Sequence, residues 1–566
     1  RILVNNIHGV DIDQQAVEVT KLSLLLKVLE EETGQLTLGF ERALPDLNDN
    51  IKCGNSLIGW DYFEGQLLPS EDEVARVNPF EWEKAFPEVF TSGTKGGFDA
   101  VIGNPPYIRI QTLKQWAQGE VDFYKKKYFS ASKGNYDIYV VFLEKGLSLL
   151  QKKGHLGFIL PHKFFQAQFA HPIRKLIAEG KHINKIIHFG SQQVFENATT
   201  YTCLFFLSKS PVTTFEYIKV ENLDKPEEIM DDINENRSND NFQKSKLPQP
   251  ETDGREYHFF VGKAKKIFEK INLQPRRLSD VTRKIFVGLQ TSADKIYVLK
   301  VLNSFENTIT CYSKSLKCEV EIEKGLVKPF LMGKDVHRYE APNPENVVIF
   351  PYLIKTYTYE LMSQSYLNNN YPLGWKYLIE NRKGLSDRER GRMYGSEFYA
   401  YIYPKNLVEF DNQKIMTPDI AYGCQFTYDQ DNNYHTTTVY SLALSKSTIE
   451  EPAFFLGLLN SKVMWYFLKN TGNVLRGGYF RFKTKYLQPF PIPNINFDQP
   501  DDVKKYDQLV KLTKHMLELH KRTPQTPFEQ EQLEREIAAT DAQIDRLVYD
   551  LYGLTEEEIK IVEGKE

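Results

Sequence analysis

The residues best suited to chemistry are Asn104, Pro105, Pro106 and Tyr107, which follow an apolar run at 98–103. The prolines have fixed φ and no N–H, and a residue before proline is pushed to extended backbone. The Asn104 amide oxygen and the Pro105 carbonyl are therefore expected to be two fixed acceptors beside an aromatic ring. Such a pair would hold the hydrogens of an amino group on a flat ring while the phenol stacks on its face. The alternative is a proline-rich turn after a buried strand.

A second polar strand tip lies near the beginning of the sequence. Residues 6–13 predict an apolar strand ending in two carboxylates, and the apolar periodicity that follows predicts an amphipathic helix with a buried inner face. Ligands bind at the carboxyl ends of strands in such αβ units. Asp11 is thus placed to accept the ribose hydroxyls of a nucleoside cofactor. Asp13 is the better N-cap for the helix.

Three flanking segments make the tetrapeptide more specific. NPFEW at 78–82, FPEVF at 86–90 and GGFD at 96–99 lead into it. This arrangement resembles the type IIG restriction–modification family, which fuses a γ-class N6-adenine DNA methyltransferase to a target-recognition domain. The resemblance implies that Asn104 and the Pro105 carbonyl bind adenine N6, that Tyr107 stacks on the flipped base, and that S-adenosylmethionine is the cofactor.

The same resemblance assigns the cofactor contacts to two strand tips. It implies that Asp11, with Ile12 beside it, binds the ribose of S-adenosylmethionine. Many relatives carry Gly-Asp where this chain has Gly54-Asn55. An amide can accept the same hydrogen bond from the adenine amino group, so Asn55 and Ser56 are expected at the cofactor. The alternative for Asn55 is an ordinary asparagine turn.

The resemblance also implies the fold class, a Rossmann-like α/β methyltransferase with a mixed sheet. Strands two to seven are recognisable, the last three at 154–161, 183–190 and 199–209. Strand one and its Gly-rich cofactor loop are missing, which would expose two sheet edges because the usual order is 3-2-1-4-5-7-6. We therefore expect the upstream part of the same protein to supply them, together with any nuclease domain. Phe195 is a candidate contact to the flipped base, although a core role is the alternative.

Four regions are expected along the chain. Residues 1–215 are the methyltransferase domain, and the polar stretch 216–275 is interpreted as a connector. Residues 276–495 predict an α+β, β-rich target-recognition domain, because pieces at 286–298, 327–336 and 458–461 resemble Taq-type adenine methyltransferases. Two apolar stripes separated by prolines predict a helical hairpin tail over 500–566.

Basic residues interleaved with aromatic ones mark a candidate DNA-binding stretch at 462–485, which has six Lys/Arg and no acid. Within it, Arg476, Tyr479, Arg481 and Lys483 are expected to contact double-stranded DNA. A second stretch, 376–405, has seven basic groups against four acids. A solvated charged face explains that second stretch equally well.

Composition limits the remaining classes. The 566 residues carry a formal charge of −4, so any basic footprint for nucleic acid must be local. The five cysteines show no metal-ligand spacing and are expected to be reduced thiols, with no metal. No apolar run is long enough for a membrane span, and a cytoplasmic location is expected.

The sequence therefore predicts a site-specific DNA methyltransferase that transfers a methyl group from S-adenosylmethionine to adenine N6. Two alternatives stay open. One is a methyltransferase with the same tetrapeptide that acts on RNA or protein. The other is a DNA-recognition fragment without activity of its own.

Overall fold

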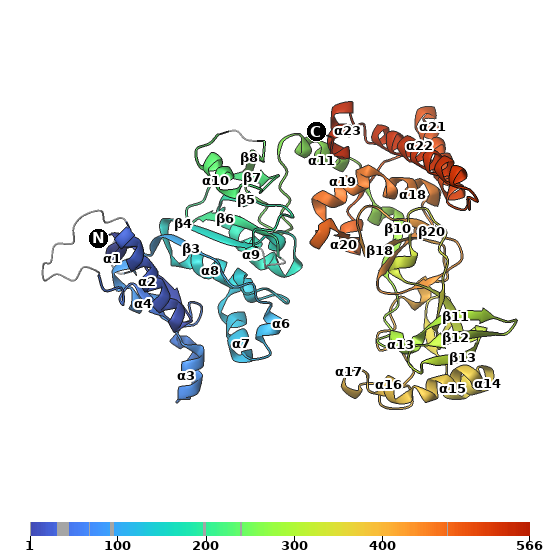
Figure 1. Ribbon diagram of the computed structural model, residues 1–566, viewed down its shortest axis with the longest axis horizontal. Coiled ribbons are helices and arrows are strands. Elements are labelled where there is room, and N and C mark those ends of the chain that lie inside the picture. The colour runs from blue at the N-terminus through green and yellow to red at the C-terminus, as the bar shows by residue number, and fades with distance from the viewer. Residues whose placement is uncertain are drawn as a thin grey trace. The chain divides into compact units, whose positions relative to one another are not determined.

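The structure, a computed structural model, describes residues 2–30, 45–66, 68–90, 96–195, 200–237, 240–472 and 474–565. Contacts within the chain divide it into two compact units, Arg1–Gly262 and Lys263–Glu566 (Figure 1). We call them the first and the second unit and describe each by itself.

A six-stranded mixed sheet forms the centre of the first unit. Its strand order is β3-β4-β6-β5-β7-β8. The strands are β3 Phe98–Gly103, β4 Leu150–Pro161, β5 Ile183–His188, β6 Thr202–Ser208, β7 Thr214–Val220 and β8 Phe242–Pro248. Strands β3 and β4 are parallel, whereas β6 runs antiparallel to both of its neighbours, β4 and β5. The first four strands of this order correspond to the predicted strands four, five, seven and six, so this part of the predicted topology is confirmed.

The predicted strands two and three form a separate parallel pair. They are β1 Gly9–Asp11 and β2 Ile51–Cys53, with Gly9 opposite Ile51 and Asp11 opposite Cys53. Among the described residues no strand joins this pair to β3. The sheet is therefore split where the predicted order has its strand one.

The connector predicted over 216–275 is wrong for much of its length. It contains most of β7, the helix α10 Pro226–Asn234, strand β8 and the helix α11 Gly262–Asn272. Its polarity misled the prediction because charged residues are interleaved with the buried apolar residues of these elements. In α10, Ile229 and Ile233 are buried and the charged residues face outward. The first unit accordingly extends to Gly262.

Helices cover the two faces of the sheet unequally. Helices α8 Tyr139–Leu149 and α9 His171–Glu179 pack on one face, against Leu156, Phe158 and Phe205. Helix α10 covers the other face only near β5, β7 and β8. On that face Ile102 of β3 is 86% exposed.

The helix after β1, α2 Gln14–Glu30, also differs from its prediction. Val17 is buried, but Val19, Leu22 and Leu26, which were expected on a buried inner face, are exposed. The apolar stripe that the sequence contains is therefore present, and the described residues cover only part of it.

The second unit is built on two antiparallel-rich sheets. The larger has the order β13-β12-β11-β15-β14-β21 and the smaller β10-β22-β18-β20. The strands of the larger sheet are β11 Val298–Ser304, β12 Thr308–Ser313, β13 Cys318–Glu323, β14 Val327–Leu331, β15 Asn346–Ile349 and β21 Tyr434–His435. Those of the smaller sheet are β10 Thr282–Val287, β18 Lys414–Pro418, β20 Thr427–Asp429 and β22 Val439–Leu444. The predicted β-rich character is confirmed.

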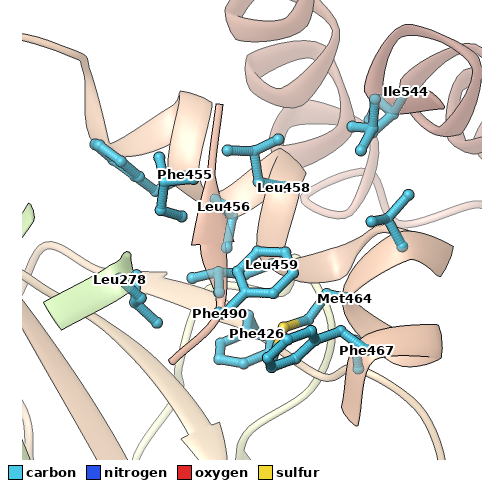
Figure 2. Packing of buried hydrophobic residues seen from close by; sticks show 14 of the residues in the cluster. Leu278, Phe426, Phe455, Leu456, Leu458, Leu459, Met464, Phe467, Phe490 and Ile544 are labelled. Carbon is cyan, nitrogen blue, oxygen red and sulfur yellow. The ribbon is translucent and has the colours of Figure 1, made fainter. Parts of the chain in front are cut away.

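Helices complete the second unit and enclose its main core. Helices α18 Pro452–Asn460 and α19 Lys462–Thr471 supply Phe455, Leu459 and Met464 to the buried cluster that also contains Phe426 (Figure 2). The tail forms the predicted hairpin and ends in a third, short helix. Its helices are α21 Pro500–Leu519, α22 Pro527–Leu551 and α23 Glu556–Glu563. Helices α21 and α22 pack on each other and on α18.

Three expectations from the sequence concern membrane-spanning helices, metal sites and the state of the cysteines. No described helix is both long and apolar enough to span a membrane. No described cluster of three His, Cys, Asp or Glu side chains could hold a metal ion. All five cysteines are free thiols.

Candidate functional site

The tetrapeptide of interest lies directly after the carboxyl end of β3. Asn104 and Pro106 are exposed, whereas Pro105 is buried and fixes the turn. Asn104 lines a hollow of about 520 Å³ together with Ile102, Ile159 and other residues of β3, β4 and β6. The amide side chain thus stands at the rim of a partly apolar depression, open to a flat ligand.

The phenol of Tyr107 is fixed by strand β4. Its hydroxyl donates a hydrogen bond to the Ile159 carbonyl at 3.2 Å, and its ring meets Tyr139 edge to face with centroids 6.3 Å apart. Burial, assisted by the Cys203 thiol, raises the pKa of Tyr107 to about 12. The phenol therefore stays neutral near pH 7, as a stacking surface requires.

The residues after the tetrapeptide pair with the segment that leads into α8. The Ile138 amide donates to the Ile108 carbonyl, and the Ile110 amide donates to the Tyr136 carbonyl, both at 2.9 Å. These two bonds form a short antiparallel bridge that centres on Arg109 and Asp137. The tip is thus held from its far side by residues 136–138.

An ion pair links that bridge to the end of β4. Asp137 is buried, and its Oδ2 lies 2.6 Å from Nζ of Lys163, in the turn that follows β4. The same ammonium lies over the Phe169 ring, 5.9 Å from its centroid. The tip of β3 is therefore tied to β4 twice, through Tyr107 and through the Asp137–Lys163 pair. The pair could not be predicted from a local pattern because its members are 26 positions apart.

The candidate cofactor residues lie at the carboxyl ends of β1 and β2. Asp11 is exposed, and its Oδ1 accepts a hydrogen bond from the Asp13 amide at 2.8 Å. Asp13 accepts from the Gln15 amide at 2.8 Å, which is the predicted N-cap contact of α2. Ile12, between them, is exposed. A carboxylate in this position is free to face a pair of hydroxyls.

Asn55 and Ser56 lie one strand away, joined to Asp11 through the backbone. The Gly54 amide donates to the Asp11 carbonyl at 2.8 Å. Asn55 is buried, and its Oδ1 accepts from the Leu57 amide at 3.1 Å, as an asparagine turn would. The Ser56 carbonyl accepts from the Trp82 indole. Each strand tip thus offers polar groups, although those of Asn55 already have a structural use.

Two partly buried histidines lie at the carboxyl ends of β4 and β5. The rings of His162, after β4, and His188, at the end of β5, are 4.4 Å apart at their centroids. Burial lowers the pKa of His162 to about 4. Burial also lowers the pKa of His188 well below its ordinary value, with further repulsion from His162 and Lys219. Both rings are therefore neutral near pH 7.

These histidines predict acid sensitivity of the first unit. In the unfolded chain they take up protons near pH 6.5, whereas the folded state resists, so stability should fall from about pH 6.5 towards pH 4 by roughly 1.4 kcal/mol per pH unit per histidine. Hydrogen exchange of the β4 and β5 segments at pH 7.5, 6 and 5 measures this loss. His162→Phe should remove one of the protons taken up on unfolding, so the free energy of unfolding should fall less steeply as the pH is lowered. Equal pH dependence in variant and parent would contradict the assignment.

Some of the candidate DNA-contacting residues lie outside the part of the chain that the structure describes. Phe195 is partly exposed, and residues 196–199, which follow it, lie outside the described residues. The side chain of Arg476 also lies outside them. Tyr479 is 46% exposed, and its ring lies 6.0 Å from that of Tyr422, which is also exposed. Tyr422 was missed because it comes from a distant segment.

Arg481 is already engaged within the protein. Its guanidinium forms an ion pair with Asp419, which is buried beside the short strand pair β19 Ile420–Ala421 and β23 Phe480–Arg481. Lys483 is half-buried, and desolvation lowers its pKa. Most aromatic side chains of 462–485, including Phe480 and Phe482, are buried in the core. They build the unit rather than line its surface.

Comparison with known proteins identifies both parts of the chain. Residues 5–195 match the Eco57I restriction-modification methylase family, and residues 328–492 match the TaqI-like C-terminal specificity domain. The chain is 29% identical over 571 residues to the type II restriction enzyme and methyltransferase RM.Eco57I of Escherichia coli. That alignment covers 98% of this chain and 54% of the relative, so the chain spans about half of that protein's length.

Two further proteins are similar to this chain. The type II methyltransferase M.PaeR7I of Pseudomonas aeruginosa is 21% identical over 83% of this chain and 73% of its own length. The DNA complex of the type IIL restriction-modification enzyme MmeI has a similar fold, with a TM-score of 0.59 at 12% identity over 99% of this chain and 66% of that one. The chain thus carries a region that matches Eco57I-type restriction-modification methylases, followed by a region that matches the TaqI-like C-terminal specificity domain.

Proposed function

We propose that the protein transfers a methyl group from S-adenosylmethionine to the N6 amino group of an adenine flipped out of double-stranded DNA. The observation that carries the proposal is the rigid tip at the end of β3. There an exposed Asn104 follows directly on a parallel strand, and Tyr107 is held beside it by the Ile159 carbonyl. Methylation within a restriction–modification system is the activity that the relatives' names describe.

In this proposal Asn104 and Pro105 act as hydrogen-bond acceptors. An amino group conjugated to a purine is a weak nucleophile because its lone pair is delocalised into the ring. Two acceptors on its hydrogens favour the geometry in which the lone pair points outward, and no strong base is needed. Pro106 keeps the tip rigid, and the neutral Tyr107 ring offsets part of the cost of unstacking the base.

The polar groups at the ends of β1 and β2 suit a nucleoside cofactor. The exposed Asp11 carboxylate would accept the ribose hydroxyls, with Ile12 against the sugar or base. Asn55 would accept from the adenine amino group through the second lone pair of its amide oxygen, beside Ser56. S-adenosylmethionine supplies a methyl group on a positively charged sulfur, which is a good leaving group.

We further propose that the full-length protein contributes a parallel strand between β1 and β3, with the Gly-rich loop that such a strand carries. The support is the split of the sheet and the apolar side chains that are exposed on β3 and α2. Ile102 on β3, and Val19, Leu22 and Leu26 on α2, are exposed. Burying a large aliphatic side chain stabilises by about 1.5–3 kcal/mol, so covering four of them gives a substantial driving force. A nuclease domain in the same protein is a further proposal, based on the relative named as both restriction enzyme and methyltransferase.

The second unit would bind the DNA. Within the stretch 462–485, Tyr479 and Lys483 are at least partly exposed, and Arg476 is close to them in the sequence. Arg481 would act mainly by holding the loop, because its guanidinium is paired with Asp419. Phe195, in the first unit, is the proposed apolar contact to the flipped base.

The decisive experiment incubates the full-length protein with labelled S-adenosylmethionine and plasmid DNA, ribosomal RNA or a peptide release factor. We expect label in DNA alone, and N6-methyl-2′-deoxyadenosine after digestion to nucleosides. Label in RNA or protein would establish the first alternative. DNA binding without transfer to any substrate would establish a recognition protein without methyltransferase activity.

The Asp137–Lys163 pair predicts a positioning effect on this reaction. Lys163→Met keeps most of the stem but removes the ammonium, which releases the bridge behind the tip. We expect kcat for DNA methylation to fall about 10- to 100-fold, as small misplacements of reacting groups do. Affinity for S-adenosylmethionine should not change, and Lys163→Arg should restore most of the rate.

The matched control is Lys153→Met, which removes an exposed lysine from β4, the strand that precedes Lys163, away from the tip. It should leave kcat unchanged. A Lys163→Met variant with a normal kcat but weaker DNA binding would mean that this lysine contacts a phosphate and does not position the tip.

A further inference from the structure

The second unit contains a strained backbone segment within the region that matches the specificity domain. Glu389, Arg390 and Gly391 have φ angles of 47°, 64° and 84°. The left-handed region costs roughly 1–2 kcal/mol for each residue with a side chain. Two such residues in succession persist only where the surrounding structure fixes them, and such strain is concentrated at functional sites.

The group that fixes this segment is Arg388. Its side chain is buried and donates to the carbonyl groups of Leu385, Thr291, Phe398 and Ala400, at 2.7, 3.0, 2.6 and 2.9 Å. Its guanidinium also lies over the Tyr297 ring, 5.6 Å from the centroid. Within the described residues no carboxylate pairs with it. The Arg388 guanidinium binds four backbone carbonyl groups. These bonds fix the position of residue 388, which directly precedes the strained residues.

The segment presents its side chains to solvent. Arg390 and Arg392 are exposed, and Tyr394 is 70% exposed. Arg392 is partly neutralised by Glu389, with N–O distance 3.2 Å, and Tyr394 donates to Asp387. Arg390 has no ion pair with any described residue. It is thus a projecting cation on a strained segment whose base is fixed by Arg388.

We propose that residues 388–395 form a base-reading loop and that Arg390 recognises a guanine of the target sequence in the major groove. The proposal rests on the proposed function. A planar guanidinium fork matches the O6 and N7 acceptors of guanine, the commonest specific contact in DNA recognition. A solvated charged face, the other explanation of the basic excess over 376–405, requires neither the strained backbone nor the buried Arg388. Arg388 is a positioning residue, and Arg390 is the specificity-determining one.

The test selects duplexes from a randomised pool by binding to the full-length protein, without any need for methyl transfer. For Arg390→Ala we expect relaxed preference at one G·C pair, by about 5- to 150-fold, with the other positions unchanged. Arg390→Lys should fail to restore that preference, because an ammonium lacks the fork. Lys376→Ala, which removes another exposed cation from the same stretch, should leave the preference at every position intact.

Folding defects are separated from recognition by Arg390→Gly, which removes the side chain and relieves the left-handed backbone. It should give the same relaxed position as Arg390→Ala. A uniform loss of affinity that Arg390→Lys restores would make Arg390 a phosphate contact and overturn the inference, as would an unchanged preference in all variants. If the parent protein itself selects no sequence, the inference and the DNA specificity of the proposed function both fail. If it selects a sequence without methylating it, only the proposed activity fails.

Discussion

Replacing Asn104 by alanine in the full-length protein should reduce methyl transfer by about two orders of magnitude or more, while DNA and cofactor binding persist. Removal of one preorganised hydrogen-bonding group from an active site typically has an effect of this size. The side chain is exposed at the end of β3, so its loss leaves no buried cavity. Single-turnover rates, together with separate titrations of DNA and S-adenosylmethionine, measure the effect.

Variants at Tyr107 are the matched control for this prediction. The phenol hydroxyl is used on the Ile159 carbonyl, so Tyr107→Phe keeps the ring and should retain most of the rate. Tyr107→Ala removes the ring and should lower the rate strongly. Wild-type transfer by Asn104→Ala would rule out the acceptor role, and a folding defect in that variant would show in its melting temperature.

Local sequence patterns predicted the elements that carry the candidate site. The strand before Asn104, the acidic tip at Asp11 and the helix that Asp13 caps all depend on contacts within a few residues. The order of β3, β4, β6 and β5 followed from the resemblance to a known fold. These features do not require knowledge of distant partners, which is why one sequence was enough.

Contacts between distant segments could not be predicted in the same way. The partner of Arg481 is Asp419, 62 positions away, and Lys163 is paired with Asp137 across the end of the sheet. The strands β7 and β8 were mistaken for a connector because charged residues are interleaved with their buried apolar residues. Composition describes a segment as a whole, whereas burial depends on which side of it another element covers.

A buried ion pair in the second unit shows how much can depend on one such distant contact. Lys414 and Asp429, on the neighbouring strands β18 and β20, are fully buried and lie 2.6 Å apart. The lysine also donates to the carbonyls of Phe410 and Asn412, and the aspartate accepts from the amide and side chain of Asn433. Burial lowers the pKa of Lys414, although Asp429 opposes this shift. The ion pair therefore connects strands β18 and β20 to two loops, one containing Phe410 and Asn412 and the other containing Asn433.

Lys414→Met should destabilise the second unit by about 3–5 kcal/mol, because it leaves the Asp429 carboxylate buried without its counter-charge. Urea unfolding of the full-length protein, followed by hydrogen exchange of the β18 and β20 segments, measures the loss. Lys414→Met combined with Asp429→Leu removes both charges and should be more stable than the single Lys414→Met variant. If the double variant is no more stable than Lys414→Met, the cost comes from the lost hydrogen bonds to the two loops and not from an unpaired charge.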